Sequence, residues 1–211
     1  MKNIFGLSIP ETLEEVCDPQ RVALLVYDMQ VGILNQIKNP EQITLQVLKV
    51  LTAARHAGVR VLFSRHLSLP KELMGMSQFR MAMAWQRTDS PEQVKPWFLR
   101  DDPSFQIIPE LAPRPTEGVF DKLTMSAFEG TWLDFALRDC GINGFIIVGV
   151  ATEIGIEPTI RHGADLGYIP VFVNDACGSG NAEAAQRSIN SIKFIGDALI
   201  TDTETVCLLW K

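Results

Sequence analysis

Two side chains in this sequence pair a carboxyl group with an amine at the ends of apolar, β-rich segments. Asp28 ends the run VALLVYD (22–28), and Lys122 lies in the weaker run VFDKL (119–123). Ligands of open parallel sheets bind outside the carboxyl ends of the strands, so both groups are predicted to reach one rim of such a sheet. A carboxyl group positioned there can act as a general acid or base.

The segment GVATEIGIEPT (149–159) is the most informative part of the chain. An apolar strand is predicted to end in a tight turn that opens a helix, and Gly155 stands in the first helical turn, facing the mouth of the fold. Glu153 in the same turn is interpreted as a carboxylate favoured by the helix dipole or as a second acid or base opposite Asp28.

Six short apolar runs alternate with helical patterns along the chain. The runs cover residues 22–28, 59–64, 119–123, 145–150, 168–174 and 198–201, and the helical stretches cover 40–57, 130–140, 153–166 and 181–195. Near-continuous Val, Ile, Leu and Phe indicate strands that are buried on both faces. The alternation predicts an α/β fold, a three-layer α/β/α arrangement around a six-stranded parallel sheet.

Residues 66–115 interrupt this alternation. No strand is predicted there, and Met, Trp and Phe side chains, Trp85 among them, are concentrated between prolines. The segment is interpreted as an insertion that covers a sheet edge or subunit interface, or as a lid over a pocket. Residues 1–211 are predicted to form one domain, and the Met and Trp content of 74–98 favours a homo-oligomer.

Composition restricts the classes of partner. The chain has 211 residues, of which 46% are hydrophobic, and a net charge of -6, which argues against a nucleic-acid surface and favours a small-molecule partner. No apolar run approaches the roughly 20 residues of a membrane span. The four cysteines lack metal-like spacing and no signal peptide is recognised, so a cytoplasmic protein with reduced thiols, no metal and no cofactor is expected.

Four motifs carry a resemblance to a known family. They are LLVYDMQ (24–30), FDKLTMSAF (120–128), GVATEIG (149–155) and DLGYIPVFVNDACG (165–178), and together they resemble the isochorismatase-like hydrolase superfamily, which includes amide-cleaving cysteine hydrolases. The resemblance implies an Asp-Lys-Cys triad in which Asp28 and Lys122 match and Gly155 replaces the cysteine. It also implies a cis peptide bond between Val150 and Ala151, and an oxyanion hole built from the amides of Ala151 and Gly155.

The glycine at position 155 decides the chemistry that is expected. Without a thiolate no thioester can form there, and Cys177, Thr152 and Ser126 are interpreted as poor substitutes, the hydroxyls because no histidine stands at a suggestive spacing. True isochorismatases resemble this chain in having glycine at that position. Their reaction protonates an enol ether through an aspartic acid, so Asp28 is predicted to act in this way, with Lys122 balancing charge and the space beside Gly155 admitting water.

The remaining candidates concern binding rather than proton transfer. Leu123 and Thr124 follow the lysine where isochorismatases carry an aromatic residue and an arginine, so isochorismate itself is a doubtful substrate, although Arg65 or Arg80 could supply charge. The histidines His56, His66 and His162 are interpreted as surface or interface residues rather than metal ligands. Substrate contacts are predicted, besides the turn residues Ala151 and Thr152, for Gln30, Ser126, Phe128, Glu153 and Trp85.

Three functional hypotheses follow from these residues. The first is a hydrolase that uses Asp28 as an acid on an enol ether or similarly labile bond. The second is an amide or ester hydrolase in which Asp28 or Glu153 activates water directly. The third is a family member without catalytic activity that binds a small ligand in the same pocket. The Asp28 and Lys122 pair favours the first two, and the loss of the cysteine favours the third.

Overall fold

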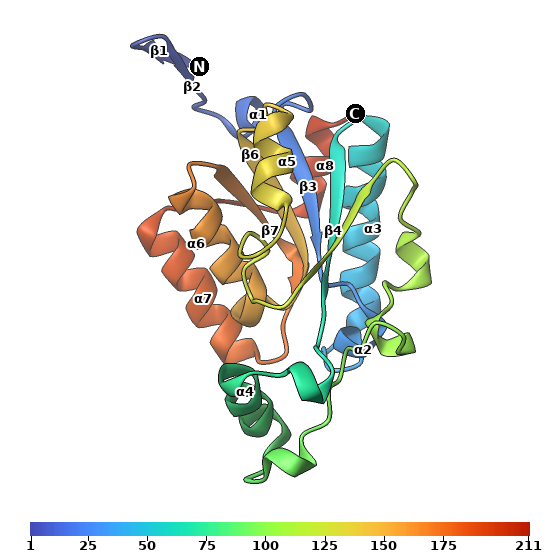
Figure 1. Cartoon of the computed structure of the whole chain (residues 1–211). Helices are drawn as coiled ribbons and strands as arrows, with labels where there is room; N and C mark the ends of the chain where they lie inside the picture. The colour runs from blue at the N-terminus through green and yellow to red at the C-terminus, as the bar shows by residue number, and fades with distance from the viewer.

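A six-stranded parallel sheet forms the centre of the computed structural model, which describes residues 1–211 (Figure 1). Its order across the sheet is β5-β4-β3-β6-β7-β8, so the direction of winding reverses between β3 and β6. The six predicted strands are confirmed, with ends shifted by a few residues. The strands are β3 (Val22–Tyr27), β4 (Arg60–His66), β5 (Gly118–Lys122), β6 (Gly144–Val150), β7 (Ile169–Gly178) and β8 (Leu199–Thr201).

Helices cover both faces of this sheet, which confirms the predicted three-layer arrangement. One buried cluster joins the sheet to α1, α3 and α8, and a second joins it to α5, α6 and α7. The helices on the two faces are α1 (Leu13–Val16), α3 (Pro40–His56), α8 (Thr203–Leu209), α5 (Leu133–Asp139), α6 (Glu157–Asp165) and α7 (Ala182–Ile195). The short α2 (Val31–Leu34) follows β3, and no helix is both long and apolar enough to cross a membrane.

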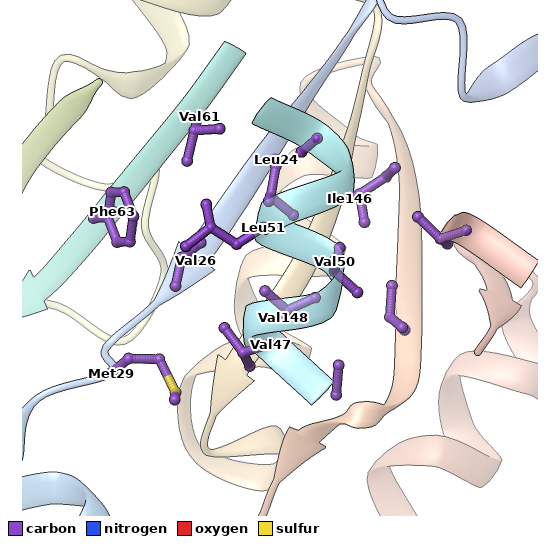
Figure 2. Close-up of a cluster of buried hydrophobic side chains, with 14 of the residues drawn as sticks. Leu24, Val26, Met29, Val47, Val50, Leu51, Val61, Phe63, Ile146 and Val148 are labelled. Carbon is purple, nitrogen blue, oxygen red and sulfur yellow. The ribbon is translucent and has the colours of Figure 1, made fainter. Parts of the chain in front are cut away.

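The central strand β3 shows why the apolar run at 22–27 is continuous. Successive side chains of a strand point to opposite faces, and both faces are covered by helices. Leu24 and Val26 belong to the cluster under α3, where Val47 and Leu51 of that helix lie (Figure 2). Tyr27 points to the opposite face and belongs to the cluster under α5 and α6. The next residue, Asp28, therefore leaves the sheet at its carboxyl edge.

The insertion contains no strand of the sheet beyond His66, as predicted, but it holds a helix that the sequence pattern did not reveal. This helix is α4 (Met76–Gln86), and short 3-10 turns flank it at Lys71–Leu73, Pro91–Gln93, Pro103–Phe105 and Pro109–Leu111. An N-terminal hairpin of β1 (Lys2–Ile4) and β2 (Leu7–Ile9) also went unpredicted, and it projects from the body of the protein (Figure 1).

Candidate active site

Asp28 lies just beyond the carboxyl end of β3 with a left-handed backbone conformation, φ 46°, which aspartate adopts more readily than most residues. Its side chain is 5% exposed. Oδ1 accepts a hydrogen bond from Ser64 Oγ at 2.6 Å, and Oδ2 accepts one from Lys122 Nζ at 2.7 Å. The carboxyl group is thus fixed by donors from the adjacent strand β4 and from β5, the next strand beyond it.

Lys122 completes a buried ion pair. Its side chain has no exposed surface, and Nζ also donates to the carbonyl of Thr124 at 3.1 Å and lies 4.4 Å from the centre of the Tyr27 ring. Burial lowers the pKa of Lys122, and the Asp28 carboxylate opposes that change. The prediction that Asp28 and Lys122 meet at one rim is confirmed.

The turn after β6 has the backbone that the resemblance implies, since the Val150–Ala151 peptide bond is cis. A π-helical turn, Thr152–Ile156, follows and leads into α6. The carbonyl of Ala151 accepts hydrogen bonds from the N–H groups of Ile154, Gly155 and Ile156, the second at 3.1 Å. The Gly155 amide, implied as an oxyanion donor, is therefore already engaged within the helix.

A cavity of about 290 Å³ opens at this rim, between the ends of β3 and β6 where the winding of the sheet reverses. Ten of its fifteen lining residues are hydrophobic, and none is a lysine, arginine or cysteine. The polar lining groups are Tyr27, Asp28, Gln36 and His66, and the large apolar ones include Ile33, Ile37, Trp85, Trp97, Phe98 and Ile154. Insertion residues thus form part of the wall over Asp28.

His66 lies in this wall, so its interpretation as a surface or interface residue was wrong. Its ring packs edge-on against Phe98, with centroids 5.8 Å apart, and its Nδ1 is buried without a hydrogen-bond partner. Burial, with a further contribution from the Lys122 charge, lowers the pKa of His66 to about 4. The imidazole is therefore neutral near pH 7 and offers one donor and one acceptor.

Among the predicted substrate contacts, Trp85 lines the cavity and Gln30 does not. The Gln30 side chain is fully buried, and its amide donates to the carbonyls of His66 and Phe105 and accepts from the His66 N–H. Gln30 therefore ties the insertion to the sheet. Phe128 packs in the core, stacked on Tyr168 with ring centroids 5.5 Å apart, and does not line the cavity.

The polar side chains of the turn that were predicted to contact substrate, Glu153 and Thr152, bind backbone groups instead. Glu153 Oε1 accepts from the N–H groups of Gly180 and Asn181 at 2.8 and 2.7 Å, so this carboxylate holds the loop before α7. The hydroxyl of Thr152 donates to the carbonyl of Gly178. Neither side chain lines the cavity, and Glu153 is not placed opposite Asp28. Glu153 thus binds the backbone of the loop before α7, and Thr152 binds the backbone at the end of β7.

Ser126 stands beside the cavity residue Met125, but it does not line the cavity. Its Oγ lies 2.9 Å from Nδ1 of His162, so the tertiary fold supplies a histidine that stands at no suggestive spacing in the sequence. The partners are 36 residues apart, on the loop after β5 and on α6, which sequence spacing does not reveal.

The other groups that could supply a thiol or a positive charge lie outside the cavity. Burial raises the pKa of Cys177 well above its ordinary value, and this thiol contacts the carbonyl of Ile147 inside the sheet. Arg65 pairs with Asp121, and Arg80 is exposed on α4. Cys177 is therefore no substitute nucleophile, and Arg65 is a salt-bridge partner.

The sequence did not reveal three residues that shape the site. Ser64 contributes a hydroxyl to Asp28, Met125 lines the cavity, and Tyr27 fills the space beside Gly155. The expectation that Gly155 leaves room for water was wrong, since a Cβ added there would lie 2.6 Å from Cε1 of the Tyr27 ring. A tyrosine immediately before the aspartate, on the face that points toward α6, was the one available signal.

Comparisons with known proteins agree with this geometry. The isochorismatase domain model matches residues 22–205. A cysteine hydrolase from Pseudomonas syringae pv. phaseolicola is 27% identical, with a TM-score of 0.76 over 90% of this chain and 92% of that one. An isochorismatase family protein from Burkholderia thailandensis is 25% identical, with a TM-score of 0.73 over 90% and 96%. N-carbamoylsarcosine amidase from Thermoplasma acidophilum shares the fold at 20% identity, with a TM-score of 0.71 over 87% and 97%.

The family match spans the sheet, both helical layers and the rim that carries Asp28 and Lys122. The structural matches extend over nearly the whole length of both partners. Because the isochorismatase domain model covers residues 22–205, this chain belongs to the isochorismatase-like hydrolase family.

Proposed function

We propose that this protein hydrolyses a small, uncharged molecule at an enol ether or similarly labile bond, with Asp28 as general acid and base and no covalent enzyme intermediate. The observation that carries the proposal is the 2.7 Å Asp28–Lys122 pair beneath a cavity whose lining includes no cysteine. An enol ether needs a proton rather than a protein nucleophile. A positioned acid contributes about 10²- to 10⁴-fold to such a reaction.

The proposed reaction begins when Asp28 transfers its proton to the terminal alkene carbon. The π electrons form the new C–H bond and leave positive charge on the carbon that bears the ether oxygen. Water adds to this carbon and returns a proton to Asp28. The resulting hemiketal breaks its bond to the leaving alcohol, whose oxygen takes the hydroxyl proton. An alcohol and a carbonyl compound are released.

Lys122 is proposed to hold the proton that Asp28 needs. An ammonium 2.7 Å from a carboxylate favours the ionised pair. Burial lowers the pKa of Lys122, so its ammonium group releases a proton more readily than that of an exposed lysine. The pair can therefore present a protonated carboxyl group to the substrate and remain neutral overall.

The cavity lining supports an uncharged substrate. A dicarboxylate such as isochorismate would meet no lysine or arginine on the wall, and it would lie against the Asp28 carboxyl group. Trp85, Trp97 and Phe98 instead offer flat apolar surfaces suited to an aromatic or alkyl body. The neutral His66 ring adds one hydrogen-bonding edge to this wall.

The second candidate is amide or ester hydrolysis by water that Asp28 activates directly. It is favoured by the hydrogen bonds from Ser64 and Lys122, which stabilise Asp28 as a carboxylate and so as a base. It is opposed by the Gly155 N–H, which already donates to the Ala151 carbonyl and is not free for a tetrahedral intermediate.

The test is a substrate panel with matched variants. Purified protein is offered uncharged aryl vinyl ethers, carboxylate-bearing enol ethers and primary amides, while carbonyl products and ammonia are measured. We expect carbonyl release from the uncharged ethers and a loss of about 10²-fold or more in kcat in Asp28→Asn. Asp121→Asn is the control, because that carboxylate pairs with Arg65 and Arg100 outside the cavity.

Three other outcomes would count against hydrolysis of an enol ether with Asp28 as the acid. Ammonia from amides, lost in Asp28→Asn, would favour direct activation of water. Ligand binding without turnover of any compound would favour the family member without catalytic activity. Equal loss in Asp28→Asn and Asp121→Asn would show that the effect of Asp28 is structural.

A further inference from the structure

Tyr27 occupies the space that a side chain at position 155 would need. A Cβ built on Gly155 would overlap the Tyr27 hydroxyl oxygen and Cζ, and it would lie 2.6 Å from Cε1, whereas real Cβ atoms stay beyond about 3.0 Å. The tyrosine is 1% exposed, and its hydroxyl donates to the carbonyl of Met125. A cysteine at 155 and this placement of Tyr27 therefore exclude each other.

The chemistry of Tyr27 differs from that of the thiol that is missing. Burial raises its pKa well above the ordinary value of 10, and the Asp28 charge adds to this effect. The residue is thus a neutral phenol and a poor nucleophile. Its hydroxyl donates a hydrogen bond to the backbone carbonyl of Met125, which leaves the phenol oxygen as an acceptor at the cavity wall beside Asp28.

We infer that Tyr27 replaces the side chain at position 155 as the polar group at this point of the cavity, and that its oxygen positions the attacking water. The role of the water rests on the proposed hydrolysis. The water donates one hydrogen to the phenol oxygen, which leaves its other proton for Asp28 and a lone pair for the substrate carbon. Lys122 Nζ lies 4.4 Å from the ring centre and contributes to holding the ring in place.

The steric half of the inference is tested by four proteins: wild type, Gly155→Cys, Tyr27→Val and the double variant. We expect Gly155→Cys to lower the urea midpoint, because the new side chain displaces Tyr27. The decrease in midpoint of the double variant should be smaller than the sum of the decreases in the two single variants. In the native double variant the new thiol should react with iodoacetamide at a rate at least tenfold above that of the partly buried Cys177, whose pKa is raised, with the site identified by peptide mass spectrometry.

Additive effects on the midpoint would overturn the steric inference. So would a Gly155→Cys protein that is as stable as the wild type and is labelled as fast as the double variant. These measurements require no turnover. They therefore stand even if every substrate of the panel fails, an outcome that would refute the proposed function alone.

The chemical half is tested by Tyr27→Phe, which removes the oxygen and keeps the ring. Loss of one hydrogen bond to the attacking water should lower kcat by about tenfold with KM unchanged. Tyr168→Phe is the matched control, because that buried hydroxyl bonds Asp134 away from the cavity. Unchanged kcat in Tyr27→Phe, or an equal decrease in Tyr168→Phe, would overturn the assignment of the phenol oxygen.

Discussion

The buried pair of Asp28 and Lys122 makes a quantitative prediction about stability. Lys122→Met keeps the apolar stem of the side chain and removes the charge. The Asp28 side chain is 5% exposed and that of Lys122 is 0% exposed, so the variant leaves a carboxylate without its cation in a buried place. Breaking such a pair destabilises a protein by about 3–5 kcal/mol. Because Ser64 still donates to Oδ1, we expect a value near the lower end, about 3 kcal/mol.

The assay is a double-mutant cycle with Asp28→Asn, Lys122→Met and both together, measured by urea unfolding at pH 7. The double variant has no buried charge, so its loss should be smaller than the sum of the single losses by about 1–3 kcal/mol. The exposed pair of Glu183 and Arg187 is the control, with an expected coupling of about 0.3–0.5 kcal/mol. Additive losses at Asp28 and Lys122 would refute the description of a tightly coupled buried pair.

The other predictions concern the cavity wall and the surface of the insertion. Unfolded His66 titrates near 6.5 and the folded residue near 4, so the unfolded state binds more protons between these values and stability falls as pH drops through them. Between these pH values the free energy of unfolding of His66→Gln should decrease by about 3 kcal/mol less than that of the wild type. Parallel profiles of unfolding free energy against pH in the two proteins would contradict this. Trp85→Ala should raise KM about tenfold and leave kcat unchanged, which initial rates would check. We also predict a homo-oligomer joined through the insertion, where Met76 is 83% exposed, and Met76→Glu should shift it to monomer in light scattering; a wild-type monomer would contradict this.

The sequence was sufficient for the sheet and for the ion pair because both depend on local signals. Strands buried on both faces are continuous apolar runs, and parallel strands bring the residues at their carboxyl ends to one rim. The sequence therefore predicts the pairing of Asp28 with Lys122 across 94 residues. Gln30 stands at the same rim and was assigned to the substrate for the same reason, yet the backbone of the insertion captures its amide.

The contacts that the sequence does not predict depend on how closely helices, strands and loops approach one another in the tertiary fold. The packing of both helical layers decides how closely a helix approaches a strand, and therefore whether Tyr27 fills the space at Gly155. The contact between Ser126 and His162 likewise joins a loop to a helix that only the tertiary fold brings together. His66 was placed on the surface because the sequence does not show that Phe98 of the insertion folds back over it.

Proton transfer by Asp28 to carbon is tested most directly by turnover of an uncharged aryl vinyl ether in H₂O and in D₂O. We predict a lower kcat/KM in D₂O for the wild type, with one deuterium in the methyl group of the acetaldehyde released, and loss of this catalysed reaction in Asp28→Asn. A wild-type kcat/KM that is the same in both solvents, or that Asp28→Asn retains, would contradict the assignment of Asp28 as the proton donor.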